Sequence, residues 1–384
     1  MKILAKTFYG LEAVLAEELK NLGASDIQIL TRAVQFEGDE KLLYRANLEL
    51  RTALRLLVPF RTFKTKHENH FYKKIKGIDW SEFLSLEDTF AIDATTQSKY
   101  LDHSKYLSLK AKDAIVDQFR EKTGLRPNVN TRSPNLRINV HLSKDNLCTL
   151  SLDSSGDSLH KRGYRISSVE APINEALAAG MILLSGWQKK SNFIDPMCGS
   201  GTLPIEAALI AYNIPPQLHR SNFGFKKWKD FDKDLWEDVV QEAREKIIGF
   251  EHRILGFDKS FEALRISNHN ALAAHMEGKI IFRRQKFEKL DPPSENGFLI
   301  MNPPYGERIE QEDINAFYKM IGDRLKQKFS GYEAWIISSN KEALKNIGLR
   351  PSRKITLFNA ALECKFQKFE LYEGTKKRKP CKKN

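Results

Sequence analysis

Two short segments of the sequence combine polar side chains with glycine or proline in a pattern that suits chemistry on a bound ligand. The first, residues 193–202 (FIDPMCGSGT), reads as the end of an apolar strand, a tight glycine turn and the start of an apolar helix. A strand, a glycine-rich turn and a helix in this order place backbone N–H groups around a nucleotide-like ligand. The second, residues 300–306 (IMNPPYG), also follows an apolar run.

The first segment favours S-adenosylmethionine over other nucleotide-like ligands. The turn lacks the Lys-Ser/Thr pair of a phosphate-binding loop, and Pro204 stands where a dinucleotide fingerprint has its third glycine. Asp195 ends the strand, where its carboxylate can meet a cationic ligand such as a sulfonium with its ammonium group. We therefore predict a methyl donor at this turn. The expected contacts in this segment are Asp195, Pro196, Cys198, Gly199, Ser200, Gly201 and Thr202.

Two later strand ends offer further contacts for the same cofactor. Asp258 ends the next predicted strand and is placed to bind both hydroxyls of a ribose, with a helix cap before Lys259 and Ser260 as the alternative. After the third predicted strand, Gln285 is polar and can recognise the adenine edge, and Lys286 is equally near. The cofactor is thus expected at the ends of three strands.

The proline-containing segment predicts a site for an amino group. Two consecutive prolines remove backbone donors and stiffen the turn, so that carbonyl oxygens point outward. The Asn302 side chain and the Pro303 carbonyl can accept the N–H groups of an exocyclic amine, and Tyr305 can stack on a flipped base. Positioning supplies much of the acceleration in such a transfer, so no strong general base is required. The expected catalytic residues are Asn302, Pro303, Pro304 and Tyr305, and a purely structural turn is the alternative.

The positive charge of the chain lies on either side of this predicted catalytic region. The net charge is +13; residues 1–165 carry 27 Lys and Arg against 21 Asp and Glu, and residues 376–384 add six basic residues. Excess positive charge in these flanking regions favours binding of a polyanion such as RNA, because contacts with phosphates supply affinity that does not depend on the RNA sequence. We expect the basic tail to be disordered and its deletion to weaken RNA binding.

Residues 59–76 form a second basic stretch, with six Lys or Arg against one acid. Phe60, Phe63, Phe71 and Tyr72 are interleaved with these cations, a combination typical of contacts with single-stranded or loop RNA. An exposed basic loop whose aromatic residues belong to a core is the alternative. The candidate RNA-binding residues, including the basic crossing at residues 160–165, are Lys64, Lys66, Lys73, Lys74, Lys161, Arg162 and Arg165.

The order of predicted elements indicates an α/β protein. Residues 1–58 alternate strands and helices as a small α/β unit, and residues 90–153 read as strands around one long helix. From residue 174 onward, strands alternate with helices and end in a hairpin at residues 354–358 and 362–372. This pattern predicts a mostly parallel, seven-stranded sheet with helices on both faces.

Composition sets limits on the class of protein. The four cysteines (Cys148, Cys198, Cys364 and Cys381) form no CxxC pair, and there is no apolar run of membrane-spanning length. The N-terminus lacks the long apolar core of a signal peptide. We expect a cytoplasmic protein without a metal site or a membrane segment.

The two segments together resemble a known family. Residues 195–202 with residues 302–308 (NPPYGER) look like the THUMP-domain-containing class I RNA methyltransferases, and most closely the bacterial 23S rRNA guanine-N2-methyltransferases. Residues 150–156 and 160–165 resemble the end of a THUMP domain and its exit. A departure from the family pattern is Gln285, which stands where the usual residue is an acid.

This resemblance implies a domain order and an activity. It implies a ferredoxin-like unit at residues 1–58, a THUMP RNA-binding domain at residues 59–160, a single Rossmann-like methyltransferase domain at residues 161–375 and a basic tail at residues 376–384. The implied reaction is S-adenosylmethionine-dependent methylation of the exocyclic N2 amine of guanine in 23S rRNA, free or in a pre-ribosomal particle. The alternatives are a tRNA guanine-N2 methyltransferase, a DNA adenine-N6 methyltransferase and a non-catalytic RNA-binding assembly factor.

Overall fold

A computed structural model of the chain describes residues 1–168, 172–306 and 311–373. The predicted basic tail, the Glu307–Arg308 part of the proline-containing segment and residue Ala171 lie outside these ranges. The chain divides into two compact units, each with its own sheet. One unit comprises residues 1–161 and 215–245, and the other comprises residues 162–214 and 246 onward.

The first unit is built on one continuous sheet. Its strand order in the described residues is β2-β3-β1-β4-β8-β7-β5-β6. The elements of its first part are β1 (Lys2–Thr7), α1 (Glu12–Asn21), β2 (Ser25–Leu30), β3 (Ala33–Glu37), α2 (Glu40–Glu49) and β4 (Ala53–Lys64). Those of its second part are α3 (Glu68–Lys76), β5 (Thr89–Thr96), α4 (Ser104–Thr123), β6 (Asn128–Val129), β7 (Leu136–Leu142) and β8 (Leu147–Asp153).

Strand β4 connects the two parts and was not predicted from the sequence. It pairs antiparallel with β1 on one side and with β8 on the other. Pro59 has no backbone N–H and argues against a central strand. The structure accommodates it because the pairing with β8 shifts register between Pro59 and Arg61. The aromatic residues of this stretch pack in the core beneath the sheet, which supports the alternative given above.

A segment from the middle of the sequence belongs to this first unit. Residues 215–245, which include the short turn η2 (Phe225–Lys227) and helix α7 (Lys233–Glu245), were assigned by the sequence analysis to the catalytic range. In the structure they pack with the amino-terminal part. Phe225 stacks on Tyr44 with 4.5 Å between ring centroids, and Trp236 contacts the same ring edge-on. Burial of these aromatic rings explains why the segment leaves the catalytic sheet.

The second unit contains the predicted parallel sheet. Its strand order in the described residues is β11-β10-β9-β12-β13-β15-β14, with β15 antiparallel to both of its neighbours. Its strands are β9 (Phe193–Asp195), β10 (Ile254–Asp258), β11 (Ile280–Arg284), β12 (Gly297–Met301), β13 (Tyr332–Ser338), β14 (Arg353–Asn359) and β15 (Leu362–Glu370). Its helices are α5 (Glu175–Ser185), α6 (Thr202–Ala211), α8 (Phe261–Ala273), α9 (Gln311–Lys328) and α10 (Lys341–Lys345).

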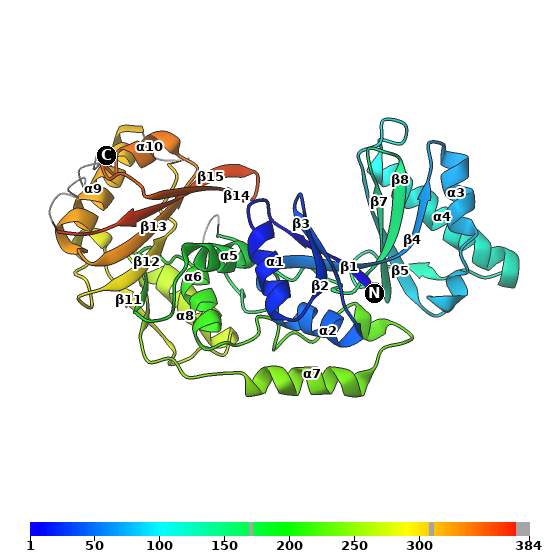
Figure 1. Ribbon diagram of the computed structural model, residues 1–384, viewed down its shortest axis with the longest axis horizontal. Helices are drawn as coiled ribbons and strands as arrows, with labels where there is room; N and C mark the ends of the chain where they lie inside the picture. The colour runs from blue at the N-terminus through cyan, green and yellow to red at the C-terminus, as the bar shows by residue number, and fades with distance from the viewer. Residues whose placement is uncertain (169–171, 307–310, 374–384) are drawn as a thin grey trace, which may run out of the picture. The chain divides into compact units, whose positions relative to one another are not determined.

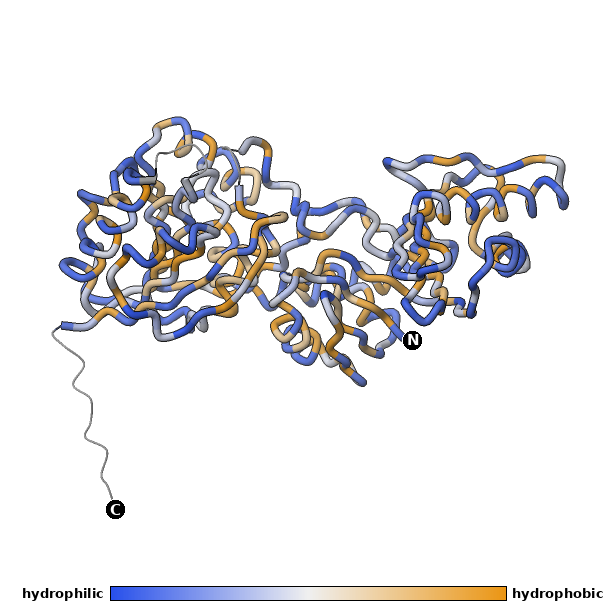
Figure 2. The backbone as a smooth tube through the Cα atoms, turned by 90° about the horizontal axis from the view of Figure 1, so that it is seen from above, coloured by the Kyte–Doolittle hydropathy of each residue, from blue (hydrophilic) through white to orange (hydrophobic). Residues whose placement is uncertain are grey.

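Helices lie on both faces of this sheet (Figure 1). Helices α9 and α10 share one apolar core with alternate strand residues such as Leu299 and Met301 of β12. Helices α6 and α8 contact β9, β10 and β11 from the other side. Strands β9, β10 and β12 are buried along nearly their whole length, as expected for strands covered on both faces, and Figure 2 shows the hydropathy along the backbone. The predicted fold class is confirmed.

No helix in the described ranges is both long enough and apolar enough to cross a membrane.

Candidate active site

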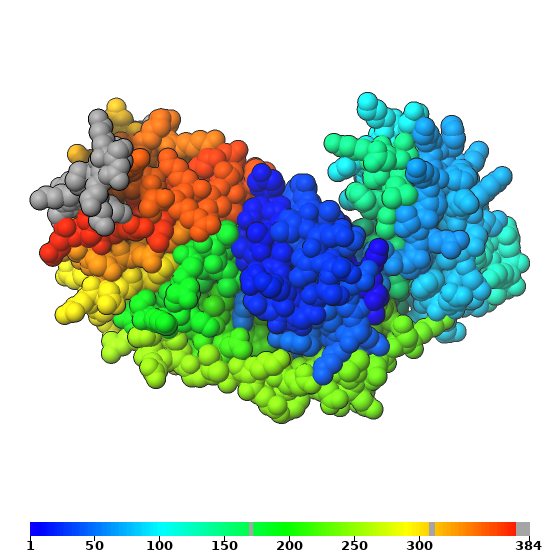
Figure 3. Space-filling view, viewed as in Figure 1, coloured from blue at the N-terminus to red at the C-terminus, as the bar shows by residue number. Residues whose placement is uncertain are grey.

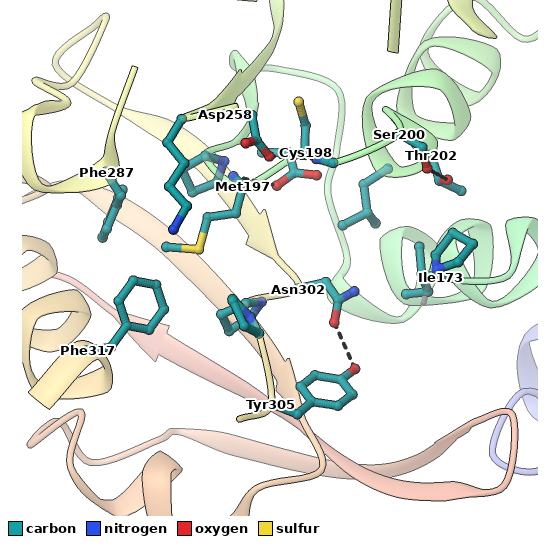
Figure 4. Close-up of a pocket in the computed structure, with 18 of the residues that line it drawn as sticks. Ile173, Met197, Cys198, Ser200, Thr202, Asp258, Phe287, Asn302, Tyr305 and Phe317 are labelled. Carbon is teal, nitrogen blue, oxygen red and sulfur yellow. Dashed lines mark hydrogen bonds between the residues drawn. The ribbon is translucent and has the colours of Figure 1, made fainter. Parts of the chain in front are cut away.

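The carboxyl ends of the central parallel strands open into one cavity of about 430 Å³. Strands β10, β9 and β12 are neighbours, so the segments that follow them meet at the same edge of the sheet. Met197, Phe287 and Phe317 line it on one side, and the predicted polar residues line the rest (Figure 4). The lining includes Asp195, Pro196, Cys198, Gly199, Ser200, Thr202, Asp258, Gln285, Asn302, Pro303, Pro304 and Tyr305. The structure therefore brings the two sequence segments together.

Close packing shapes the glycine turn. Gly201 has φ of +80°, and a Cβ atom there would lie 2.9 Å from the Cβ of Ser267 on α8. A side chain at this position would meet both strain and a clash. Cys198 lies against Gly256 of β10, is buried, and donates its backbone N–H to Phe257 at 2.8 Å. Burial raises the pKa of the Cys198 thiol well above its usual value, so this cysteine packs as a neutral group.

Asp195 presents a buried carboxyl group to the cavity. The residue is 2% exposed, and its Oδ1 accepts the backbone N–H of Met197 at 3.1 Å. Burial raises its pKa to about 8, and the negative charge of Asp258 adds to that rise. None of the lysines, arginines and histidines that the structure describes forms an ion pair with it. A cationic ligand entering the cavity would supply the missing countercharge, which fits a sulfonium compound with its ammonium group.

Asp258 connects the end of β10 to the glycine turn. Its Oδ2 accepts the N–H of Gly199 at 3.0 Å, and its Oδ1 accepts the N–H of Ser260 at 2.9 Å. The cap of α8 is Ser260 itself, whose hydroxyl accepts the N–H of Ala263. Each carboxylate oxygen keeps a further lone pair for a hydroxyl donor. The helix-cap alternative for Asp258 therefore does not hold, and the ribose contact stays a prediction.

Gln285 is held in one orientation. Its Nε2 donates to the carbonyl of Lys289 at 2.7 Å, and its backbone N–H donates to the carbonyl of Asp258 at 3.0 Å. The side-chain NH2 group is thus engaged, and the Oε1 is the end that is left to accept a hydrogen bond. The adenine contact of Gln285 stays a prediction, and an acceptor in this position is compatible with it.

The proline-containing turn is tied down by residues from two later elements. Tyr318 of α9 donates its hydroxyl to the Pro304 carbonyl at 3.1 Å and lies 2.7 Å from the Ser338 hydroxyl at the end of β13. The Asn340 side chain donates to the Tyr305 carbonyl at 3.0 Å. Burial raises the pKa of Tyr318 to about 12, so its hydroxyl remains a donor at neutral pH. No local pattern in the sequence marks these three residues, because they meet the turn only in the folded sheet.

These contacts leave two acceptors on the turn. The Asn302 Oδ1 accepts the Tyr305 hydroxyl at 2.7 Å, which orients the amide with its oxygen held in place (Figure 4). That oxygen retains its second lone pair. The Pro303 carbonyl accepts no hydrogen bond from the protein within the described ranges, whereas the carbonyls of Pro304 and Tyr305 do. The turn therefore offers the two acceptors that an exocyclic amine needs.

The predicted RNA-binding residues divide into two groups. Lys64, Lys66, Lys73, Lys74 and Lys161 are exposed. Arg162 is not available to RNA, and this prediction is corrected. Its guanidinium is 1% exposed and bonds Glu206 of α6 at 3.1 and 3.3 Å, and Tyr164 donates to the same carboxylate at 2.9 Å.

Arg165 also faces the protein. It lies 3.1 Å from Glu175 and donates to the Thr202 hydroxyl at 3.1 Å and to the Ile173 carbonyl at 2.6 Å. Thr202 begins helix α6 directly after the glycine turn. An arginine of the basic crossing predicted from the sequence thus contacts the end of the cofactor turn through Thr202. A charged residue this close to a buried carboxylate is stabilised by that partner and is not free for a phosphate.

Comparison with known proteins identifies the family. The domain described as "RMKL-like, methyltransferase domain" matches residues 162–368, the THUMP domain matches residues 65–153, and the RlmL ferredoxin-like domain matches residues 2–57. The chain belongs to the THUMP-containing, RMKL-like family of RNA methyltransferases. The predicted resemblance and the predicted order of ferredoxin-like, THUMP and class I methyltransferase parts are confirmed, and the finer boundaries stay predictions.

Three relatives illustrate the similarity. The "Putative RNA methyltransferase slr0064" of Synechocystis sp. (strain ATCC 27184 / PCC 6803 / Kazusa) is 41% identical over 365 residues, covering 94% of this chain and 95% of that protein. The "Ribosomal RNA large subunit methyltransferase K/L" of Syntrophotalea carbinolica is 37% identical over 97% of this chain, which spans only 54% of that longer protein. The solved structure of SMU.472, a putative methyltransferase complexed with SAH, is 29% identical, covers 97% of this chain and 99% of its own, and superposes with a TM-score of 0.87.

The bound SAH of that structure is the demethylated form of S-adenosylmethionine. Together with the family, it establishes S-adenosylmethionine as the cofactor of this chain, as predicted. The protein is an S-adenosylmethionine-dependent RNA methyltransferase.

Proposed function

We propose that this protein methylates the exocyclic N2 amine of a guanine in 23S rRNA. The observation that carries the proposal is the pair of acceptors on one rigid turn, the Asn302 Oδ1 and the Pro303 carbonyl, at the edge of the cofactor cavity. The name of the Syntrophotalea relative supports large-subunit rRNA, although this chain covers 54% of that protein. Guanine is supported by the resemblance of the two sequence segments.

We assign the cofactor to the cavity at the ends of β9, β10 and β11. Asp195 would face the cationic part of the cofactor, Asp258 its ribose hydroxyls and Gln285 the adenine amine, with Pro196, Cys198, Gly199, Ser200, Gly201 and Thr202 shaping the turn. When bound, S-adenosylmethionine supplies an electrophilic methyl carbon. The protein's own contribution is to exclude water with Met197, Phe287 and Phe317 and to hold the nitrogen near that carbon.

The target nitrogen would be held through its two hydrogens. The Asn302 Oδ1 and the Pro303 carbonyl each accept one N–H, which draws the nitrogen lone pair away from the base ring. Tyr318 and Asn340 would hold the turn in place when the base binds, since each donates a hydrogen bond to a carbonyl that follows Pro303. Tyr305 closes the site below Asn302 and offers its ring to the flipped base. Neither acceptor is a base, so the geometry favours catalysis by positioning.

Nucleoside analysis tests the proposal directly. The protein is incubated with labelled S-adenosylmethionine and, side by side, undermethylated ribosomal RNA, transfer RNA and DNA, and each product is digested to nucleosides. We expect label in N2-methylguanosine from the ribosomal RNA. Label only in N6-methyladenosine, only in transfer RNA, or in none of the three would contradict the proposal. Calorimetry with S-adenosylmethionine serves as the control that the preparation binds its cofactor.

A further inference from the structure

At one end of the strands of the THUMP domain, exposed lysines come from the end of β4, from the segments that follow β4, β5 and β7, and from the start of α4. Lys64, the last residue of β4, pairs with Leu147 at the start of β8, and Thr96 at the end of β5 pairs with Leu142 at the end of β7. The segments after β4 and β5 and the β7–β8 turn therefore share one end of the sheet (Figure 1). We call this end the strand-end surface and define it by Lys64, Lys66, Lys99, Tyr100, Lys105 and Lys144.

The lysines of the strand-end surface differ from three lysines of the same domain that have acidic partners. On α3 and α4, Lys76 bonds Glu121, Lys112 bonds Asp113, and Lys122 bonds Asp79. Other lysines of α3 and α4 (Lys73, Lys74, Lys110, and Lys105 of the surface itself) have no such partner among the described residues. In the ranges described above, none of the five lysines of the strand-end surface has an acidic partner within 4 Å. All five are exposed. Their charge is therefore available to an external anion.

Tyr100 is the exposed aromatic residue of this surface. Its side chain leaves the residue 60% exposed, and the Lys66 Nζ lies 5.2 Å from the centre of its ring. An aromatic residue with this exposure and a neighbouring ammonium group forms a platform on which a base can stack while the cation meets the adjoining phosphate. The cyan segment around residue 100 and the green β7–β8 turn adjoin in Figure 3.

The loop that carries Tyr100 is held by its own hydrogen bonds. The buried Ser98 donates its hydroxyl to the Asn146 Oδ1 at 2.6 Å and accepts the N–H of Tyr100 at 3.1 Å. Thr96 donates its hydroxyl to the Leu101 carbonyl at 2.6 Å. A platform that is already ordered loses little conformational entropy on binding.

Three acids lie near these lysines in the sequence, one of them at the start of α3. Glu68, Asp102 and Asp145 are exposed, and the Glu68 carboxylate accepts the Tyr106 hydroxyl. Five lysines against three acids leave the strand-end surface positive. The carboxylates repel phosphates, so we expect the RNA backbone to avoid them. Their presence argues against binding driven by charge alone.

We propose that the strand-end surface binds a single-stranded segment of the RNA substrate, with Tyr100 stacked on a base. The proposal rests on the proposed function only in taking RNA as the substrate. An exposed ring favours an unpaired strand, because bases in duplex RNA are already stacked and present only sugars, phosphates and a shallow groove. The lysines around the ring supply the phosphate contacts.

Binding of short RNA to the full chain tests this proposal. A labelled single strand of mixed sequence and the same strand annealed to its complement are titrated, with fluorescence anisotropy as the readout. We expect tighter binding of the single strand, about tenfold weaker binding for Tyr100→Ala, and binding within twofold of the parent for Tyr100→Phe. For Lys66→Ala we expect the slope of log affinity against log salt to fall by about 0.7.

Controls and contrary results are distinct from those of the methylation assay. Tyr9→Ala removes an exposed tyrosine elsewhere in the first unit, and Lys112→Ala removes a lysine that has an acidic partner; both should bind RNA as the parent does. Tyr100→Ala binding within twofold of the parent, or equal affinity for the duplex, would overturn the proposal. Because no methyl transfer is measured, a wrong target base would leave this result intact.

Discussion

Basic residues have different roles in two regions of this protein. Next to the cofactor turn, two arginines form ion pairs inside the protein. Arg162 pairs with Glu206 of α6, and Arg165 pairs with Glu175. On the strand-end surface, lysines point outward with no acidic partner among the residues described. Both regions are rich in basic residues in the sequence. The difference teaches that the position of a cation in the fold, and not the local charge count, decides whether it can meet RNA.

The largest effect is expected at the buried arginine Arg162, whose replacement should lower the stability of the fold. Replacement Arg162→Met leaves the buried Glu206 carboxylate without its cation, and removal of one partner of such a pair costs about 3–5 kcal/mol. Urea denaturation monitored by circular dichroism measures the loss. The exposed neighbour is the matched control, and Lys161→Met should change the midpoint by little.

A double variant separates the pair from its packing. Arg162→Met combined with Glu206→Met removes both charges, and the protein should recover a large part of the lost stability. If the double variant is no more stable than Arg162→Met, the arginine acts by volume and not through its carboxylate partner.

The next largest effect is expected at the acceptors of the proline-containing turn. Asn302→Ala removes the side-chain oxygen that we assign to the target amine, and we expect kcat to fall by about 10²–10³. The dissociation constant of S-adenosylmethionine should stay within twofold. Asn296→Ala, at an exposed position of the same unit, is the control. An equal loss of cofactor affinity in Asn302→Ala would show that the residue belongs to the cofactor site instead.

Cofactor affinity should depend on pH through Asp195. Because burial raises the pKa of this carboxyl to about 8, it is largely neutral at pH 7 in the free protein. A cationic cofactor favours the ionised form, so binding releases a proton and affinity should rise with pH up to about 8. Below that value the loss approaches tenfold per pH unit. Calorimetry at several pH values measures it. Asp195→Asn should bind weakly with no such slope, and a slope retained in this variant contradicts the assignment.

The smallest effect is expected at a residue that acts through the turn. Tyr318→Phe removes the donor to the Pro304 carbonyl, and a lost hydrogen bond of this kind should lower kcat about fivefold while KM for RNA stays constant. Tyr332→Phe is the matched control, since this buried tyrosine donates to Ser294 away from the cavity. A rise in KM with constant kcat would mean that Tyr318 affects RNA binding and not the alignment of the acceptors.

The sequence predicts those parts of the site that lie on one continuous segment. Residues 195–202 and 302–305 were found because a strand end and its following turn determine their local geometry. Tyr318, Ser338 and Asn340 were missed because they reach the turn from other elements. Arg162 was misassigned because a sequence shows charge but not burial. Strand β4 was missed because Pro59 argues against a strand, whereas the fold accommodates this proline at a register shift. Tyr100 stands out only once Phe60, Phe63, Phe71 and Tyr72 are seen in or against the core.

Mapping of methylated positions in ribosomal RNA from cells with and without this protein tests the central claim most directly. We predict that one N2-methylguanosine in 23S rRNA disappears when the protein is absent. The wild-type chain should restore it, and the Asn302→Ala variant should not. An unchanged pattern of N2-methylguanosine in cells that lack the protein, or full restoration by Asn302→Ala, would contradict the account.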